Sequence, residues 1–349
     1  MTGLITSADN PALAQQITQR LQQRGLPGED FGPLAALALR LGLILGTAEP
    51  RLRRPQLLLF AADHGIAVDG VAPPGHPTTA RCVQSLLAGE APLGGLGRAL
   101  GLPLCVVDAG IADRLPALEG LVTRKIAHGT RNARAGAAMT MVQTQAALRA
   151  GREIAETWPG NVMGCAGLGV GSMESAALVL AGLTDLPVDA LLDSGPAMPP
   201  ERLAHLRLVA QGVQARHPQV RDPIEVLAAF GGFEIAMMAG ALLGAAQRRI
   251  VTLVDGLAAC AALQVARQVD PAVADYALLC ASRRHQGLAR ALAALPAHRL
   301  PALDVDALDG TGAVLAMPLL QAAVPLLAPA PVAVLPGSEA GVPRIDGRR

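Results

Sequence analysis

Short apolar runs that alternate with longer helical patterns constrain the fold of this chain more than any other feature. Each run ends in a polar or glycine-rich turn, and the five runs span residues 56–63, 102–111, 161–167, 249–257 and 276–282. Strands that are buried on both faces of a parallel sheet have this continuous apolar character. Helical patterns between successive runs therefore predict βαβ units and a parallel sheet.

The helical patterns occupy residues 11–24, 34–45, 78–100, 140–157, 172–183, 222–247 and 286–294. Aromatic residues make up only 2% of the chain, which favours helices packed closely on a sheet over an aromatic-rich sandwich. We predict an α/β fold with a doubly wound, mainly parallel, Rossmann-like sheet. Residues 52–295 would form the large domain, and residues 1–51 with 296–349 a smaller helical lobe.

Charge and cysteine usage exclude several classes of protein. The formal net charge is +1 and no basic stripe is present, so we expect no nucleic-acid partner. The five cysteines are scattered without a CxxC pair, which argues against a zinc site or a disulfide framework and fits a reducing cytoplasm. The seven histidines also lack ligand spacing, so we assign no metal.

One uncharged stretch, residues 310–338, has the length of a membrane span, but five prolines interrupt it. A single spanning helix tolerates such interruptions badly. We predict a buried helix followed by an irregular tail, with no membrane span. The first 19 residues are polar and contain no apolar signal core, which again favours a cytoplasmic protein.

Three predicted strands end in an acid with a glycine one or two positions later, in the segments 61–65, 107–110 and 254–256. Because ligands of parallel α/β sheets bind off the carboxyl ends of the strands, these acids would face one rim. Asp63 is equally compatible with a ligand-binding carboxylate and with a turn cap that accepts backbone N–H bonds.

A glycine-rich segment enters the helical pattern that begins at residue 172. Gly167, Gly169 and Gly171 alternate there, directly before Ser172. Backbone N–H groups at such a helix start bind phosphate well, although the glycines could also serve only close packing. We favour phosphate binding. Glu174 argues against it, because its negative charge would repel a phosphate.

Two further features remain ambiguous from the residues alone. The Gly231-Gly232 pair interrupts an apolar helix and implies that a ligand or a neighbouring helix approaches the backbone. Asp309 precedes a Gly-x-Gly turn that opens another apolar helix. It is either a general base held on a rigid turn or a helix cap, and an isolated Asp-Gly favours the cap.

Taken in order, six segments resemble the nicotinate-nucleotide:dimethylbenzimidazole phosphoribosyltransferase family, which builds the lower ligand of cobalamin. The resemblance extends from about residue 26 to about residue 327. Its most specific parts are FAADHGIAVDGV (60–71), VVDAGI (106–111), HGTRNARAGAAM (128–139), VLAAFGGFEIAMMAGALLGAA (226–246), LVDGLAACAAL (253–263) and DGTGAVLAMPLL (309–320).

The resemblance implies a homodimer that needs no metal or redox cofactor. It also implies a reaction of small-molecule substrates, in which a benzimidazole nitrogen attacks C1′ of nicotinate mononucleotide to give α-ribazole phosphate and nicotinate. Asp309 would be the base. The groups implied at the phosphate and ribose are Gly167, Gly169, Gly171, Ser172, Asp255, Gly256, Gly310 and Thr311. Those implied at the aromatic base are Asp63, Pro74, Cys82 and Leu308.

The chain departs from the family pattern at several of these implied site residues and near them. Asp309 stands where the family has a glutamate, which shortens the arm of the base by one methylene. Other changes replace an acid by Gly167, a lysine by Leu206, and an Asn-Thr-Thr run by residues 172–174, while Pro74 and Cys82 replace a serine and a glutamine. His205 and Arg207 flank Leu206 as substitute cations. An alternative is a catalytically degenerate homologue that binds a nucleotide or aromatic base as a regulator or partner.

Overall fold

A parallel sheet of seven strands organises the computed structural model, which describes residues 4–23, 32–195, 197–280, 285–301 and 310–328. The strand order is β3-β2-β1-β4-β5-β6-β7 and every neighbouring pair is parallel. The strands are β1 (Gln56–Ala62), β2 (Leu104–Gly110), β3 (Leu121–Thr123), β4 (Val162–Leu168), β5 (Val251–Val254), β6 (Ala277–Leu279) and β7 (His298–Arg299). The chain winds outward in both directions from β1 and β4, which confirms the doubly wound α/β prediction.

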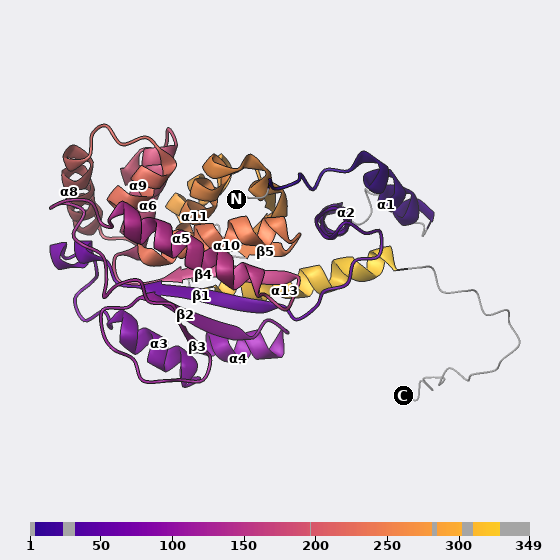
Figure 1. The fold of residues 1–349 in the computed structure, drawn as a ribbon, viewed down its shortest axis with the longest axis horizontal. Helices are drawn as coiled ribbons and strands as arrows, with labels where there is room; N and C mark the ends of the chain where they lie inside the picture. Colours follow the sequence, from indigo (N-terminus) through magenta and orange to yellow (C-terminus); the bar gives the residue numbers. More distant parts are fainter. Residues whose placement is uncertain (1–3, 24–31, 196, 281–284, 302–309, 329–349) are drawn as a thin grey trace, which may run out of the picture.

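Helices cover both faces of this sheet (Figure 1). α10 packs on β1, β2 and β4 and also on α5 and α11, whereas α3 and α4 lie on the opposite side. The helices are α1 (Pro11–Gln23), α2 (Gly32–Leu45), α3 (Thr79–Leu87), α4 (Pro92–Ala99), α5 (Met141–Glu156), α6 (Ser172–Leu183), α7 (Val188–Leu192), α8 (Pro200–Arg216), α9 (Pro223–Phe230), α10 (Phe233–Gln247), α11 (Leu257–Val269), α12 (Gln286–Ala294) and α13 (Thr311–Ala323). Three 3₁₀ turns complete the elements: η1 (Gly65–Asp69), η2 (Pro271–Tyr276) and η3 (Val324–Leu327).

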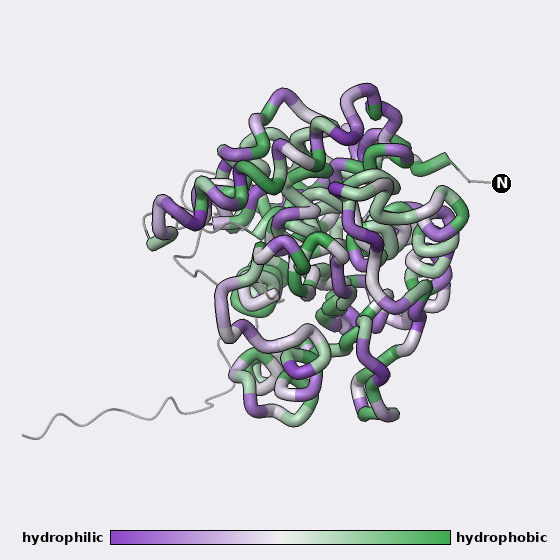
Figure 2. Tube along the Cα trace, turned by 90° about the vertical axis from the view of Figure 1, so that its left-hand side faces the viewer, coloured by the Kyte–Doolittle hydropathy of each residue, from purple (hydrophilic) through white to green (hydrophobic). Residues whose placement is uncertain are grey.

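Small residues allow the close contact between helices α5 and α10. A Cβ atom at Gly240 would lie 2.0 Å from the carbonyl oxygen of Leu148, and one at Gly151 would lie 1.9 Å from that of Met237. Each glycine therefore lets one helix backbone approach the other. Apolar segments gather in the interior of the molecule (Figure 2), as expected for a core built from small aliphatic residues.

Two predicted helices are each divided in the structure. The pattern over 78–100 is two helices, because Pro92 begins α4 after a turn with Gly89 in the left-handed region. The pattern over 222–247 divides at Gly231 and Gly232, whose backbones are extended. The group that approaches Gly232 is His64, since a Cβ there would lie 2.2 Å from His64 Cε1. A Cβ at Gly231 would lie 2.7 Å from the carbonyl oxygen of Leu227 in α9, so contacts within the protein account for both glycines.

The terminal segments pack together at one end of the sheet. α2 contacts α1 and α13, and η3 contacts both α1 and α2 (Figure 1). Arg20 joins these segments by donating hydrogen bonds from Nη1 to the carbonyl oxygens of Ala48 and Leu327. β7 nevertheless belongs to the large sheet, and α13 also contacts β4. The division into a large domain and a terminal lobe stays a prediction.

The uncharged stretch after residue 310 begins with α13, whose inner face is buried and whose interior contains Pro318. The helix predicted there is confirmed, and the tail beyond residue 328 lies outside the described residues. Within the described part of the chain, no helix combines the length and the apolar character that crossing a membrane requires.

Candidate active site

Two adjoining cavities lie at the carboxyl ends of β1 and β4. The larger, about 330 Å³, lies between the loop that begins at Val71, the start of α6 and the first turns of α8; we name it the α8 cavity. The smaller, about 250 Å³, lies between α3 and the starts of α6 and α11; we name it the α3 cavity. Both are lined by His76, Gly169, Val170, Met173 and Leu257.

The glycine-rich segment separates the two cavities. Gly167, Gly169 and Ser172 line the α3 cavity, and Gly169 and Gly171 line the α8 cavity. Packing also demands these glycines: a Cβ at Gly169 would lie 1.9 Å from the carbonyl oxygen of Ala62, and Gly171 has a φ of 89°. Both roles considered for these glycines are thus compatible with the structure, because the positive end of α6 faces ligand space.

A buried polar network holds the start of α6 in place. Glu234 Oε1 accepts hydrogen bonds from His64 Nε2 at 2.7 Å and from Ser172 Oγ at 2.8 Å. The other ring nitrogen of His64 lies 2.8 Å from Ser175 Oγ. His64 is 3% exposed and Glu234 is fully buried. The network therefore links the end of β1 and the start of α10 to Ser172, a residue that lines the α3 cavity.

Opposing effects act on the pKa of His64. Burial lowers it, but the charge of the Glu234 carboxylate and the hydrogen bond to it raise it, with smaller contributions from Asp63 and Glu174. The result is a pKa above the ordinary histidine value. The histidine therefore tends to carry a positive charge that the buried carboxylate compensates.

Asp63 is hydrogen-bonded to two segments around the site, at Thr79 and at Ala112. Its Oδ1 accepts a hydrogen bond from Thr79 Oγ1 at 2.5 Å, and its Oδ2 accepts one from the Ala112 N–H at 2.8 Å. Thr79 Oγ1 in turn accepts the N–H of Val170 at 3.1 Å. These contacts support the turn-cap alternative for Asp63, and the side chain acts on the α3 cavity through Thr79, which lines it.

Asp255 anchors the start of α13. Its Oδ2 accepts the Ala313 N–H at 3.1 Å, and a Cβ at Gly312 would lie 2.6 Å from its Oδ1. Gly310, with a φ of 93°, begins this helix against Leu57. The predicted ribose-binding residues Gly256, Gly310 and Thr311 are thus brought near one buried carboxylate. The predicted base Asp309 and its neighbour Leu308 lie outside the described residues.

The predicted base-binding residues divide between the cavity and its surroundings. Cys82 lines the α3 cavity, and burial, with the charge of Asp63, raises the pKa of its thiol. Pro74 lies on the exposed loop, next to Pro73, which lines the α8 cavity. Much of the α3 cavity wall is apolar, from Leu168, Val170, Met173, Leu257 and Ala258. A flat aromatic ring suits such a slot.

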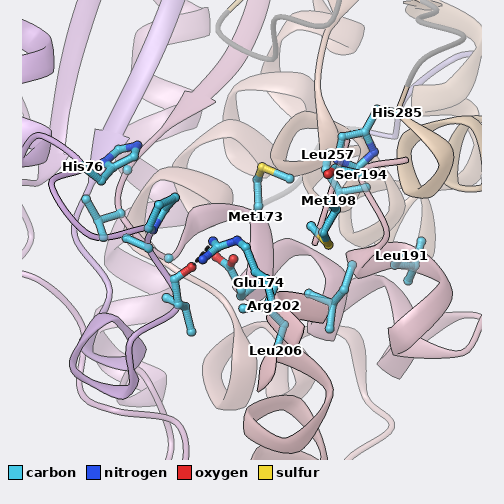
Figure 3. Close-up of a pocket in the computed structure, with 17 residues that line it drawn as sticks. His76, Met173, Glu174, Leu191, Ser194, Met198, Arg202, Leu206, Leu257 and His285 are labelled. Carbon is cyan, nitrogen blue, oxygen red and sulfur yellow. Dashed lines mark hydrogen bonds between the residues drawn. The ribbon is translucent and has the colours of Figure 1, made fainter. Parts of the chain in front are cut away.

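Of the polar groups in the α8 cavity, which Figure 3 shows, sequence reasoning noted Glu174 and assigned no role to the others. Arg202 lies beside Glu174, with His76 across the cavity and Ser194 farther along its wall. Arg202 Nη2 donates a hydrogen bond to the carbonyl oxygen of Val71. Burial raises the pKa of Glu174, an effect that the charge of Arg202 partly offsets.

The cations expected to replace the lysine point elsewhere. Leu206 is 2% exposed and lines the α8 cavity. His205 Nε2 binds the carbonyl oxygen of Asp69 at 2.7 Å, and Arg207 pairs with Asp189 at 3.6 Å on the surface. Neither His205 nor Arg207 is among the residues that line the cavity. The described residues also contain no group of three or more His, Cys, Asp or Glu side chains that could hold a metal ion.

A doubly wound sheet with a glycine-rich helix start and two cavities at its carboxyl edge is the architecture of a protein that binds small molecules. The family model that matches residues 5–332 has the description Phosphoribosyltransferase. Relatives define the family more closely. The nicotinate-nucleotide–dimethylbenzimidazole phosphoribosyltransferase of Cupriavidus taiwanensis is 44% identical over 319 residues, which are 90% of this chain and 92% of the relative. The enzyme of the same name from Cupriavidus necator is 43% identical, covering 93% and 94%.

A solved structure agrees with these sequences. The crystal structure of the Thermus thermophilus enzyme of that name superimposes with a TM-score of 0.83 at 33% identity, covering 91% of this chain and 96% of the other. The chain belongs to the nicotinate-nucleotide–dimethylbenzimidazole phosphoribosyltransferase family and is a transferase.

Proposed function

We propose that this enzyme transfers the phosphoribosyl group of nicotinate mononucleotide to a benzimidazole-type base, in assembly of the cobalamin nucleotide loop. The observation that carries the proposal is the pairing of an apolar slot with a cavity that contains the charged side chains of Arg202 and Glu174, across the start of α6. The aromatic base fits the α3 cavity, and the ribose and phosphate extend past the glycine-rich segment into the α8 cavity. Family membership supports the choice of substrates.

The reaction needs few groups from the protein. A benzimidazole nitrogen attacks C1′ of the ribose, and the bond from C1′ to nicotinate breaks. Nicotinate leaves with the bonding electron pair, which neutralises its ring nitrogen. The N–H proton of the attached benzimidazole passes to the carboxylate of Asp309. Positioning of the two substrates therefore supplies much of the rate, with one base to remove the proton.

Asp255 and Gly310 hold the start of α13, the helix that directly follows the proposed base in the sequence. Asp255 holds the first turn of α13 through the Ala313 N–H, and Asp309 directly precedes Gly310. We assign Gly256 and Thr311 to ribose contacts at the same place, and Gly167, Gly169, Gly171 and Ser172 to the ribose and phosphate. We also propose a homodimer in the cytoplasm, which family resemblance and five free cysteines support.

Turnover by the purified protein tests the function. Nicotinate mononucleotide is incubated separately with dimethylbenzimidazole, benzimidazole, adenine and a phenol, and free nicotinate and the α-riboside are separated and quantified. We expect nicotinate release with the benzimidazoles. If no base gives release while the nucleotide still raises the melting temperature, the chain binds without catalysis and the transferase proposal is wrong.

A further inference from the structure

The α8 cavity contains one strong cation, in a position to which the family resemblance assigns no ligand. Among the described residues that line it, Arg202 is the one arginine or lysine. The side chain comes from the first turn of α8 and is partly buried. Its Nη2 is tied to the carbonyl oxygen of Val71, so the guanidinium is held in a fixed orientation toward the cavity (Figure 3).

We propose that Arg202 binds the 5′-phosphate of the nucleotide donor, together with the backbone at the start of α6. This inference rests on the proposed function and names the group that recognises the phosphate. A guanidinium has five N–H donors in a planar fork. One bond to Val71 therefore leaves donors for phosphate oxygens. Gly169 and Gly171 line the same cavity, which places the positive end of α6 near this cation.

Glu174 is a carboxylate in the α8 cavity, close to Arg202. It lines the α8 cavity in the first turn of α6, and Arg202 is close enough to lower its pKa. A phosphate dianion that enters must compete with this carboxylate for the guanidinium. We therefore infer that Glu174 weakens phosphate binding while it is ionised, and that the carboxylate partly neutralises Arg202 before the donor binds.

Leu206 occupies the position of the family's lysine, and Arg202 lies one turn earlier on the same helix. Leu206 lies on the same helix and lines the same cavity, so a lysine there would reach the space that Arg202 serves. In this chain Leu206 contributes apolar surface instead. A lysine introduced at 206 should therefore substitute for a missing Arg202 charge.

The test compares Arg202→Gln with the wild type on two donors, nicotinate mononucleotide and nicotinate riboside, which lacks the phosphate. The glutamine amide keeps a donor for Val71 but removes the charge. We expect KM for the mononucleotide to rise about ten- to a hundredfold, the loss of a charge-assisted hydrogen bond. KM for the riboside and kcat with either donor should change little. Adding Leu206→Lys to Arg202→Gln should recover most of the lost affinity.

Three comparisons make the result decisive. Arg207→Gln removes a cation from the same helix that lies on the surface, and we expect it to leave both KM values unchanged. Glu174→Gln should lower KM for the mononucleotide and not for the riboside. Calorimetric titration with nicotinate mononucleotide gives the same ranking without turnover, so an inactive wild type would not obscure it. An equal effect of Arg202→Gln on both donors, or none on the mononucleotide, would overturn the assignment.

Discussion

At the residue scale, the proposed site differs from the family pattern in side chains that are shorter or less polar. Asp309 has one methylene fewer than the glutamate that the pattern places there. The structure gives its neighbours a rigid setting, because Asp255 fixes the start of α13 and Gly310 packs against Leu57.

Replacement of Asp309 by asparagine removes the proposed base without changing its size. We expect kcat to fall by about 10²- to 10⁴-fold, the usual contribution of general base catalysis. The melting temperature and the affinity for the mononucleotide should stay near those of the wild type. Asp309→Glu restores the family's longer arm and should keep activity. Turnover by Asp309→Asn at the wild-type rate would remove Asp309 as the base.

Cys82 offers a chemical probe of the α3 cavity. It is the one cysteine of the five that is not fully buried, so iodoacetamide should label it first. Because burial and Asp63 raise the pKa of its thiol, labelling should be slow near pH 7 and faster as the pH rises. Mass spectrometry gives the site and the rate.

Alkylated Cys82 should block the slot, so activity should fall in parallel with labelling. Dimethylbenzimidazole should slow both processes, and Cys82→Ser should resist inactivation. If labelled enzyme kept full activity, Cys82 would not border the aromatic base.

At the scale of elements, the connections between β1, α6 and α10 decide the shape of the site. His64 follows β1, Ser172 begins α6 and Glu234 lies in the first turn of α10. Removal of one member leaves the others buried without compensation, which is more costly than the loss of an exposed ion pair. Gly232 belongs to this arrangement, because any larger side chain would displace His64.

The charge of His64 makes part of the stability depend on pH. Its pKa in the folded protein is raised, so the stabilisation is fully present below the unfolded value of about 6.5. It is lost as the pH rises through the higher folded pKa. We expect the free energy of unfolding of the wild type to fall from pH 6 to pH 9 relative to that of His64→Gln, in urea titrations. A constant difference between the two proteins would contradict a charged His64.

The contact between α5 and α10 gives a second prediction at this scale. In Gly240→Ala the new methyl group would meet the Leu148 backbone, and we expect a loss of about 1–3 kcal/mol in the free energy of unfolding. Gly95→Ala is the matched control, because a Cβ there meets nothing within 4 Å. That change lies within α4 and should stabilise by about 0.5–1 kcal/mol. Equal effects of the two substitutions would show that the close packing is relaxed.

At the scale of the whole molecule, periodicity predicted the architecture better than the details of the site. The apolar runs at β1, β2, β4 and β5 were recognisable because both faces of each are buried. β3 and β7 have three and two residues, too few to show a pattern. α8 was missed because its buried residues, Leu206, Val209, Ala210 and Val213, form a narrow stripe among polar ones.

In the candidate site, too, some residues were predictable from the sequence and others were not. The glycines were predicted because they alternate directly before a helical pattern, and Cys82 because it stands at a position that the family pattern assigns to the aromatic base; these residues line the cavities. Arg202 could not be predicted, since only the fold brings the first turn of α8 against the start of α6. The network of His64 and Glu234 joins residues 170 positions apart, and no local pattern reveals such a pair.

The central claim is that this molecule catalyses phosphoribosyl transfer, and stoichiometry tests it most directly. Purified protein is given nicotinate mononucleotide and dimethylbenzimidazole, and the products are quantified by chromatography over time. The account predicts nicotinate and α-ribazole phosphate in equal amounts, both absent from a parallel reaction with Asp309→Asn. Nucleotide binding by the wild type without release of nicotinate, whichever base is supplied, would contradict it and leave a binding protein built on a transferase fold.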